Sequence, residues 1–375
     1  MGYSVLRNIL KETNRRIELL DLPYEEEFRC QLKYLGFKEK YIVKEAFFRQ
    51  EWNIGSTRVL RLLQEANILT ASEFILSLES IDLTQQIMND LLEAEYVLLA
   101  NIIQFAYQET PHSQLLTKIL KESFGTLIAD LKENPNAIPR NYLLALKNHL
   151  SKEKMIALKN EHLHMLVVEQ DLLELHVAIG KQEQWRCEME MLSKTIVGGM
   201  IVELIEDKNS IVNIFKELIG SCSSFSVRYI LYILNLVSRT IGMNKKESTP
   251  LKELMKDLFR MVVNTGLLSK LQLMLLFARE ICSSNESILG TYSEWYKQTI
   301  GEMTYSIKKE QFINMMEMLT STLSSETSLD ILAVHSTIAI SAPAKCNDYV
   351  VNYKQLCRAH ISQLKSPDVT IVVDD

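Results

Sequence analysis

Hydrophobic residues recur every three or four positions along nearly the whole chain, which is the spacing of one face of an α-helix. The pattern predicts helices over these ranges: 4–20, 24–35, 38–52, 57–67, 71–79, 83–108, 112–133, 140–152, 154–179, 182–206, 209–219, 224–241, 250–264, 268–283, 286–301, 308–322, 327–340 and 347–364. Only the last residues break the pattern, so the sequence predicts an all-α fold.

Local chemistry supports several of the predicted helix ends. Thr70 precedes Glu73 by three residues and predicts a capping box, in which each side chain accepts a bond from a free backbone N–H. Pro111 and Pro250 each follow a threonine, as first-turn prolines follow N-caps. Glycines stand where helices are expected to end in a left-handed C-cap: Gly36, Gly180, Gly220 and Gly242.

The second half of the chain repeats its helical pattern with a period of roughly 35–45 residues, as stacked helix pairs do in HEAT and armadillo proteins. Residues 227–240 would pair with 251–263, and residues 268–281 with 312–323. The repeats share no consensus residues, so an irregular bundle is an alternative for this half. We therefore expect an irregular helical bundle followed by a HEAT/armadillo-like α-solenoid, with a short extended C-terminal tail.

Three regions follow from this pattern. The polar, proline-containing loop at residues 133–139 is the best candidate for a boundary. We expect an N-terminal helical region at 1–134, a helical-repeat-like region at 135–365, and a flexible tail at 366–375.

Composition and charge narrow the classes of protein. The chain has 12 Gly and 7 Pro in 375 residues, fewer than sheets and long loops need. A net charge of −6 gives no general attraction to nucleic acid. The six cysteines are scattered without a C-x-x-C pair, which favours reduced thiols in the cytosol or nucleus. The longest apolar stretches fall short of the ~18–20 residues that a membrane span requires, so we predict no membrane segment.

Residues 62–117 contain no Lys or Arg and are strongly apolar. One interpretation is an acidic, apolar surface that docks a partner helix. The other is a buried helix pair with a few exposed acidic positions, because buried helices are apolar all round.

No catalytic motif is present: the sequence contains no phosphate-binding loop, no G-x-S-x-G and no H-E-x-x-H. His162 and His164 would lie about 200° apart on one helix and could not share a metal ion. The residue types of a zinc site occur in a second group, but with spacing that matches no common zinc module: His335, Cys346, Cys357 and His360. We predict no catalytic residues, no metal and no cofactor.

Basic and aromatic residues alternate near the N-terminus, as in Lys40, Tyr41, Lys44 and Phe48. Acidic residues lie among them, whereas a groove that follows phosphates needs uncompensated cations. A solvated helix face with an aromatic core behind it explains the pattern better, and direct nucleic-acid binding is not expected.

The C-terminus holds the one dense run of β-branched residues, which follows Ser366 and Pro367. Its aliphatic members are Val369, Ile371, Val372 and Val373, and its acidic members are Asp368, Asp374 and Asp375. An extended aliphatic run can add a strand to the edge of a partner's sheet, while carboxylates contact basic residues at the rim.

This run resembles a SUMO-interacting motif. The resemblance covers about eight residues and implies binding to SUMO or SUMO-modified proteins through Val369, Ile371, Val372 and Val373, with Asp374 and Asp375 at the charged rim. Phosphorylation of Ser366 would add negative charge to the same flank. Another β-augmentation partner and a tail without function are the alternatives.

These observations together favour a non-enzymatic α-helical scaffold or adaptor in a multiprotein complex, stably bound to a helical partner subunit. The motif implies recruitment to SUMO-modified nuclear partners, in genome maintenance such as DNA repair or in transcription. The alternatives are a cytosolic adaptor for trafficking or the cytoskeleton with an inert tail, and an enzyme without a familiar motif.

Overall fold

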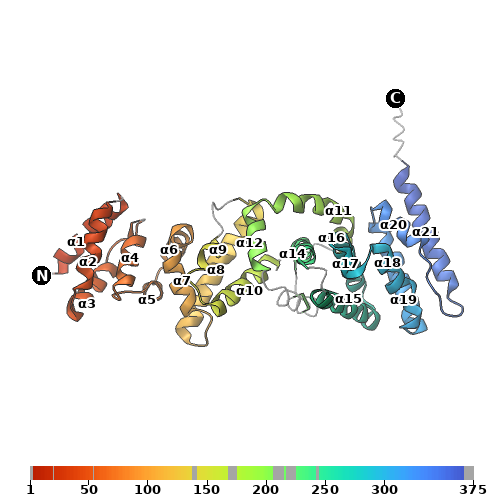
Figure 1. Ribbon diagram of the computed structural model, residues 1–375, viewed down its shortest axis with the longest axis horizontal. Coiled ribbons are helices and arrows are strands. Elements are labelled where there is room, and N and C mark those ends of the chain that lie inside the picture. The colour runs from red at the N-terminus through yellow and green to blue at the C-terminus, as the bar shows by residue number, and fades with distance from the viewer. Residues whose placement is uncertain are drawn as a thin grey trace, which may run out of the picture. The chain divides into compact units, whose positions relative to one another are not determined.

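A computed structural model describes residues 3–19, 21–53, 55–136, 142–167, 175–205, 215–216, 225–241 and 245–366 of the chain. Most of these residues lie in helices, and none lies in a strand (Figure 1). The predicted all-α fold is confirmed. None of the described helices is both long enough and apolar enough to cross a membrane.

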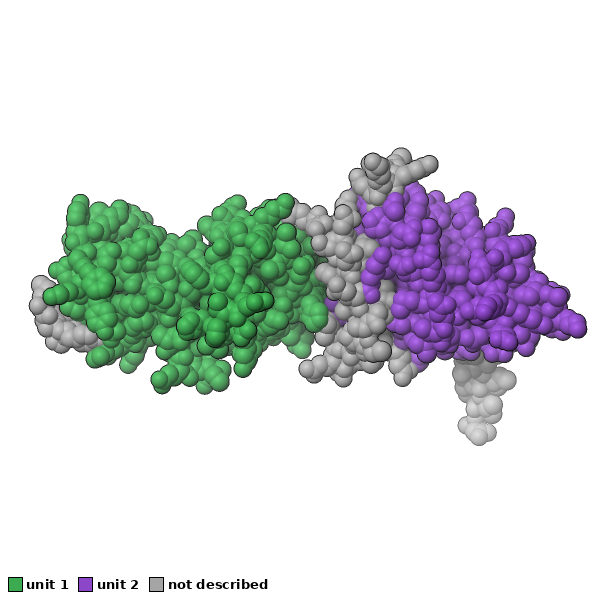
Figure 2. All heavy atoms as spheres, turned by 90° about the horizontal axis from the view of Figure 1, so that it is seen from below, with its two compact units in different colours: residues 1–165, 195–204 green, residues 166–194, 205–375 purple. Residues whose placement is uncertain are grey.

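The chain forms two compact units, coloured separately in Figure 2. Unit 1 comprises residues 1–165 and 195–204, and unit 2 comprises residues 166–194 and 205–375. The boundary predicted near residue 134 falls inside unit 1, where α7 (Tyr96–Phe105) packs against α9 (Tyr142–Leu146) from beyond it. Whether the two sides of residue 134 fold separately stays a prediction.

Unit 1 is an irregular helical bundle in which most helices pack on near neighbours in sequence, whereas its last helix packs on one about 50 residues earlier. Besides α7 and α9, its helices are α1 (Tyr3–Glu18), α2 (Leu22–Lys33), α3 (Phe37–Phe48), α4 (Ser56–Glu65), α5 (Ala71–Leu76), α6 (Ile81–Ala94), α8 (Pro111–Glu133), α10 (Lys152–Val167) and α12 (Ile196–Leu204). The capping box of Thr70 with Glu73 and the first-turn Pro111 are present as predicted.

The segment predicted as one helix over 83–108 is two helices, α6 and α7, which break at Glu95 and pack on each other. Glu95 is buried, and a carboxylate oxygen lies 3.9 Å from the Arg61 guanidinium. Burial raises the pKa of Glu95, and the charge of Arg61 opposes the rise. A tertiary contact therefore accompanies the break, where the sequence carries no Gly or Pro. Of the two interpretations of residues 62–117, buried packing fits, because Ile87, Leu91 and Leu99 are fully buried.

Unit 2 is compatible with either a helical bundle or a solenoid, and its helices pack around one central helix. Its helices are α11 (Leu175–Leu192), α14 (Val227–Thr240), α15 (Lys245–Thr265), α16 (Leu268–Ser284), α17 (Glu286–Leu289), α18 (Tyr292–Tyr296), the π-helical turn η1 (Lys297–Gly301), the 3-10 turns η2 (Met303–Tyr305) and η3 (Leu323–Ser325), α19 (Lys309–Thr322), α20 (Leu329–Thr337) and α21 (Asn347–Lys365).

Helix α16 is the centre of unit 2 and is buried on all sides from Leu271 to Cys282. It packs against α11, α14, α15 and α19, and α19 in turn packs against α21. The predicted pairing of residues 268–281 with 312–323 is the contact of α16 with α19. The other predicted partners, at 227–240 and 251–263, each pack on α16.

Three local predictions were wrong. Gly36 is the N-cap of α3 in extended backbone, with no left-handed φ. Gly180 lies inside α11, where a Cβ would stand 3.1 Å from the Ser325 carbonyl oxygen, so close packing rather than a helix end explains this glycine. Pro250 lies inside α15, which begins at Lys245, and is therefore not a first-turn residue. Gly220 and Gly242 lie outside the described residues.

Candidate protein-interaction sites

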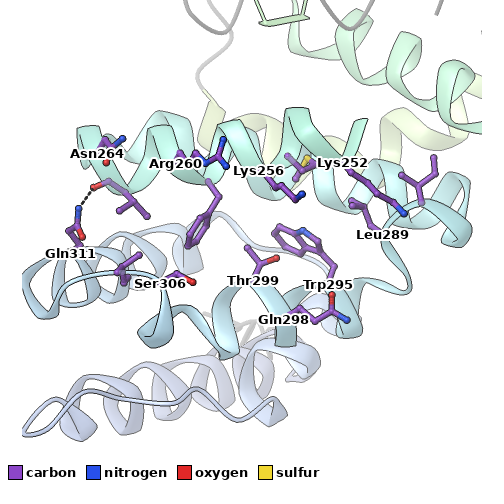
Figure 3. A pocket seen from close by; sticks show the side chains of 15 residues that line it. Lys252, Lys256, Arg260, Asn264, Leu289, Trp295, Gln298, Thr299, Ser306 and Gln311 are labelled. Atoms are coloured by element: carbon purple, nitrogen blue, oxygen red, sulfur yellow. Dashed lines mark hydrogen bonds between the residues drawn. The ribbon is translucent and has the colours of Figure 1, made fainter. Parts of the chain in front are cut away.

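An open groove lies in unit 2 between α15 on one side and α17, α18, η1, the turn after η2 and the start of α19 on the other (Figure 3). Its volume is about 770 Å³. The side chains that line it are Lys252, Met255, Lys256, Phe259, Arg260, Val263, Asn264, Ile288, Leu289, Trp295, Gln298, Thr299, Ser306, Ile307 and Gln311. None of these side chains is acidic. We call this feature the α15 groove.

Three cations form one rim of the α15 groove. Lys252, Lys256 and Arg260 follow one another at intervals of four residues along one side of α15. Lys256 forms an ion pair of 2.8 Å with Glu253, and Arg260 one of 3.1 Å with Asp257, both within α15. Such exposed pairs contribute only about 0–1 kcal/mol, so a competing carboxylate could exchange with them at little cost.

The floor of the groove is apolar, and the opposite wall carries an amide and a hydroxyl side chain. Trp295 is almost fully buried beneath the groove, and Phe259 and Ile307 are half-buried beside it. Gln298 and Thr299 point from the facing wall (Figure 3). The groove thus combines an apolar floor, uncharged donors and acceptors on one wall, and positive charge on the other.

The facing wall is built by a π-helical turn, η1, which continues directly from α18. Single π-turns inside helices are rare and occur frequently at functional sites, because they change the direction of the side chains they carry. Gly301, at the end of η1, allows close backbone packing: a Cβ there would stand 2.8 Å from the carbonyl oxygen of Ala339. The wall is therefore fixed against the loop that precedes α21.

Behind this region, unit 2 contains a buried polar cluster centred on α16. Arg279 and Glu326 form an ion pair whose side chains are 6% and 3% exposed. Glu280 is fully buried and accepts hydrogen bonds from the amides of Asn235 and Gln182. Charged groups are tolerated in such a core only when they are paired and hydrogen-bonded, as these are.

A family model described as the Fanconi anaemia group A protein N terminus matches residues 8–366. The chain belongs to this family. The family points to a subunit of a DNA-repair complex, which agrees with the predicted complex subunit at this coarse level. No curated protein sequence matches the chain.

The α15 groove is a feature of this Fanconi anaemia group A family member that sequence reasoning missed. The signal was present as cations at residues 252, 256 and 260, spaced four apart on a predicted helix. The residues of the opposite wall begin at Ile288, 28 positions beyond Arg260, so only the fold brings the two sides together.

The group of His335, Cys346, Cys357 and His360 does not form a metal site. His335 is buried and bonds the hydroxyls of Tyr292 and Tyr353, each at 2.9 Å from a ring nitrogen. Burial lowers the pKa of His335 well below its usual range, so the ring is neutral and donates one bond and accepts the other. The other members do not join it: His360 bonds the Glu326 carbonyl oxygen, and Cys357 is a buried thiol. Within the described residues, no three His, Cys, Asp or Glu side chains are arranged to hold a metal ion.

The pair His162 and His164 is separated, as its spacing predicted. His162 is fully buried, and its ring bonds the Tyr142 hydroxyl and the Leu158 carbonyl oxygen. Burial lowers the pKa of His162 to about 4. His164 is exposed, so the two rings face opposite ways.

The basic and aromatic N-terminal segment is partly core and partly surface. Lys40 donates to the Ala66 carbonyl oxygen, and Lys44 lies 3.6 Å from a Glu73 carboxylate oxygen. Phe48 stacks on Phe74. These contacts match the predicted solvated face over an aromatic core, although three aromatic rings are largely exposed: Tyr34, Phe37 and Tyr41.

Of the predicted tail site, only Ser366 lies within the described residues. It caps α21, is exposed, and its hydroxyl donates to the Ser362 carbonyl oxygen at 3.0 Å. The remaining tail residues lie outside the described residues: Asp368, Val369, Ile371, Val372, Val373, Asp374 and Asp375. Their role in binding SUMO stays a prediction.

Proposed function

We propose that this chain is a non-enzymatic helical scaffold in a nuclear DNA-repair complex, where it binds other protein subunits. The single observation that carries the proposal is the family match over residues 8–366, which spans both compact units. The fold is consistent with such a role, because stacked helices offer long surfaces for partner subunits.

The proposal can be tested by tagging the full chain at its N-terminus and purifying it from cells, followed by mass spectrometry. We expect co-purification of DNA-repair proteins in stable proportion to the chain, and nuclear staining of the tagged protein. Recovery of trafficking or cytoskeletal proteins in their place, with cytoplasmic staining, would support the adaptor alternative and contradict the proposal.

We further propose that the tail recruits the chain to SUMO-modified partners. The support is the aliphatic run with flanking carboxylates, which has the chemistry of a peptide that adds a strand to a sheet edge. Because Ser366 is exposed at the end of α21, it is accessible to a kinase. Phosphate at Ser366 would add about two negative charges beside the acidic flank.

The test is a pull-down of the full chain on immobilised SUMO. We expect Val372→Ala/Val373→Ala to reduce recovery by about tenfold or more, because the aliphatic contacts carry most of the binding free energy. A matched control is Val351→Ala/Leu356→Ala, which removes two exposed aliphatic side chains from α21. Equal recovery of wild type and the tail variant would show that the tail does not bind SUMO.

A further inference from the structure

We infer that the α15 groove is a docking site for an acidic amphipathic helix of a partner protein. The inference rests on the proposed function only in that both make the chain a protein-binding subunit. The α15 groove lies outside the tail. The inference concerns the chemistry of a partner segment and not the identity of the complex.

The charge pattern of the groove points to an acidic ligand. Three cations and no carboxylate are among the side chains that line it. Lys252, Lys256 and Arg260 are spaced by four residues, and four residues of α-helix rise about 6 Å. A second helix lying along α15 with carboxylates at the same interval would place one opposite each cation. This match of spacing favours a helix of about three turns.

The apolar part of the groove points to an amphipathic ligand rather than a simple anion. Phe259, Val263 and Ile307 are half-buried and offer apolar surface beside the cationic rim, above the almost fully buried Trp295. A helix with an apolar stripe beside its acidic stripe would cover this surface, which is the helix-in-groove mode of recognition. The Gln298 and Thr299 side chains on the facing wall can bond exposed polar groups of the ligand.

The ion pairs inside α15 give the inference a distinctive consequence. Lys256 and Arg260 are paired with Glu253 and Asp257, so a ligand carboxylate competes with two carboxylates of the protein. Removing those two carboxylates should therefore strengthen binding of the ligand. If the cations only stabilised α15, removing their partners would not strengthen binding.

The experiment measures binding of a labelled synthetic 15-residue helical peptide to the full chain by fluorescence anisotropy. The peptide carries a leucine stripe and glutamates at positions i, i+4 and i+8; a control peptide has glutamine in place of glutamate. We expect the acidic peptide to bind about tenfold more tightly than the control, with an affinity that falls as salt rises.

Three variants test the site. We expect Lys252→Glu/Lys256→Glu/Arg260→Glu to weaken binding by about tenfold or more, and Glu253→Gln/Asp257→Asn to strengthen it by about threefold. The matched control Lys354→Glu/Arg358→Glu/Lys365→Glu makes the same charge change on α21 and should leave binding unchanged. Circular dichroism shows whether each variant keeps its helical content.

The inference is overturned if the α15 and α21 charge reversals weaken binding equally, or if the paired-carboxylate variant binds no better than wild type. It is also overturned if single-stranded DNA of similar length binds the groove more tightly than the acidic peptide. Failure of peptide binding would leave co-purification with DNA-repair proteins unchanged, so the two proposals fail separately.

Discussion

Unit 2 uses the same chemical groups in opposite ways at two places, the buried cluster of α16 and the α15 groove. The Arg279–Glu326 pair is 6% and 3% exposed, whereas the Arg260–Asp257 pair is 66% and 40% exposed. In the core, each charge needs its particular partner because water cannot replace it. At the groove, water or a ligand can replace the partner. Burial, rather than residue type, separates structural charges from those available for binding.

The largest expected effect comes from breaking the buried ion pair. Arg279→Met leaves the Glu326 carboxylate buried without its cation and should lower the free energy of unfolding by about 3–5 kcal/mol. Arg260→Met, the matched change at the groove, should change it by less than about 0.5 kcal/mol. Urea denaturation of the full chain measures both.

A double variant separates the charge effect from lost packing. Arg279→Met/Glu326→Gln removes both charges and keeps an acceptor for the Ser328 N–H. We expect it to be more stable than Arg279→Met alone. If the two single changes, at Arg279 and Arg260, cost the same, the contrast between core and groove is wrong.

The second effect concerns pH. The pKa of His162 is lowered to about 4 and that of His335 well below its usual range, both chiefly by burial. In the unfolded chain each would titrate near 6.5. The contribution of each buried neutral ring to the free energy of unfolding is therefore complete above pH 6.5. It is lost as the pH falls below that value. For His162 the loss at pH 5 is about 2 kcal/mol.

Denaturation midpoints at pH 7 and pH 5 check this expectation. The His162→Phe variant should lose less stability between the two values than wild type does. Arg260→Met should follow the wild-type curve, since the groove rim carries no histidine. An unchanged slope in His162→Phe would show that this buried ring does not couple folding to pH.

The smallest effect concerns the wall of the groove. Gly301→Ala places a methyl group against the Ala339 carbonyl oxygen and should destabilise the chain by about 1–2 kcal/mol. Gly125→Ala, inside α8, meets no atom within 4 Å and should stabilise it by about 0.5–1 kcal/mol. Thermal denaturation of the two variants measures the sign of each change in stability. If both variants are more stable than wild type, the wall is loosely packed.

The sequence predicted the class of fold because helical periodicity depends on local spacing alone. It did not predict the break at Glu95, where a buried carboxylate lies beside Arg61 from another helix. It placed a helix end at Gly180, whereas that glycine serves close packing against Ser325. Both errors arise from contacts between residues far apart in the chain.

The candidate sites also divide into those that local spacing predicts and those that only contacts between distant residues create. The spacing of His162 and His164 was enough to separate the two rings, because both lie on one helix. The α15 groove was missed, because Trp295 and Gln298 line the same groove as Lys256 only after the helices of unit 2 have packed. The aliphatic run of the tail is local in sequence, and its role in binding SUMO stays a prediction.

The π-helical turn η1 also makes a comparison among relatives informative. A π-turn holds one more residue than the α-helical turn it replaces, so it can arise by a single inserted codon. A relative that lacks one residue within Lys297–Gly301 would continue α18 as a regular helix. Its following side chains would be turned by about 100° per residue removed, and the amide wall would no longer face α15. The length of this short segment in a relative therefore indicates whether that relative can form the amide wall.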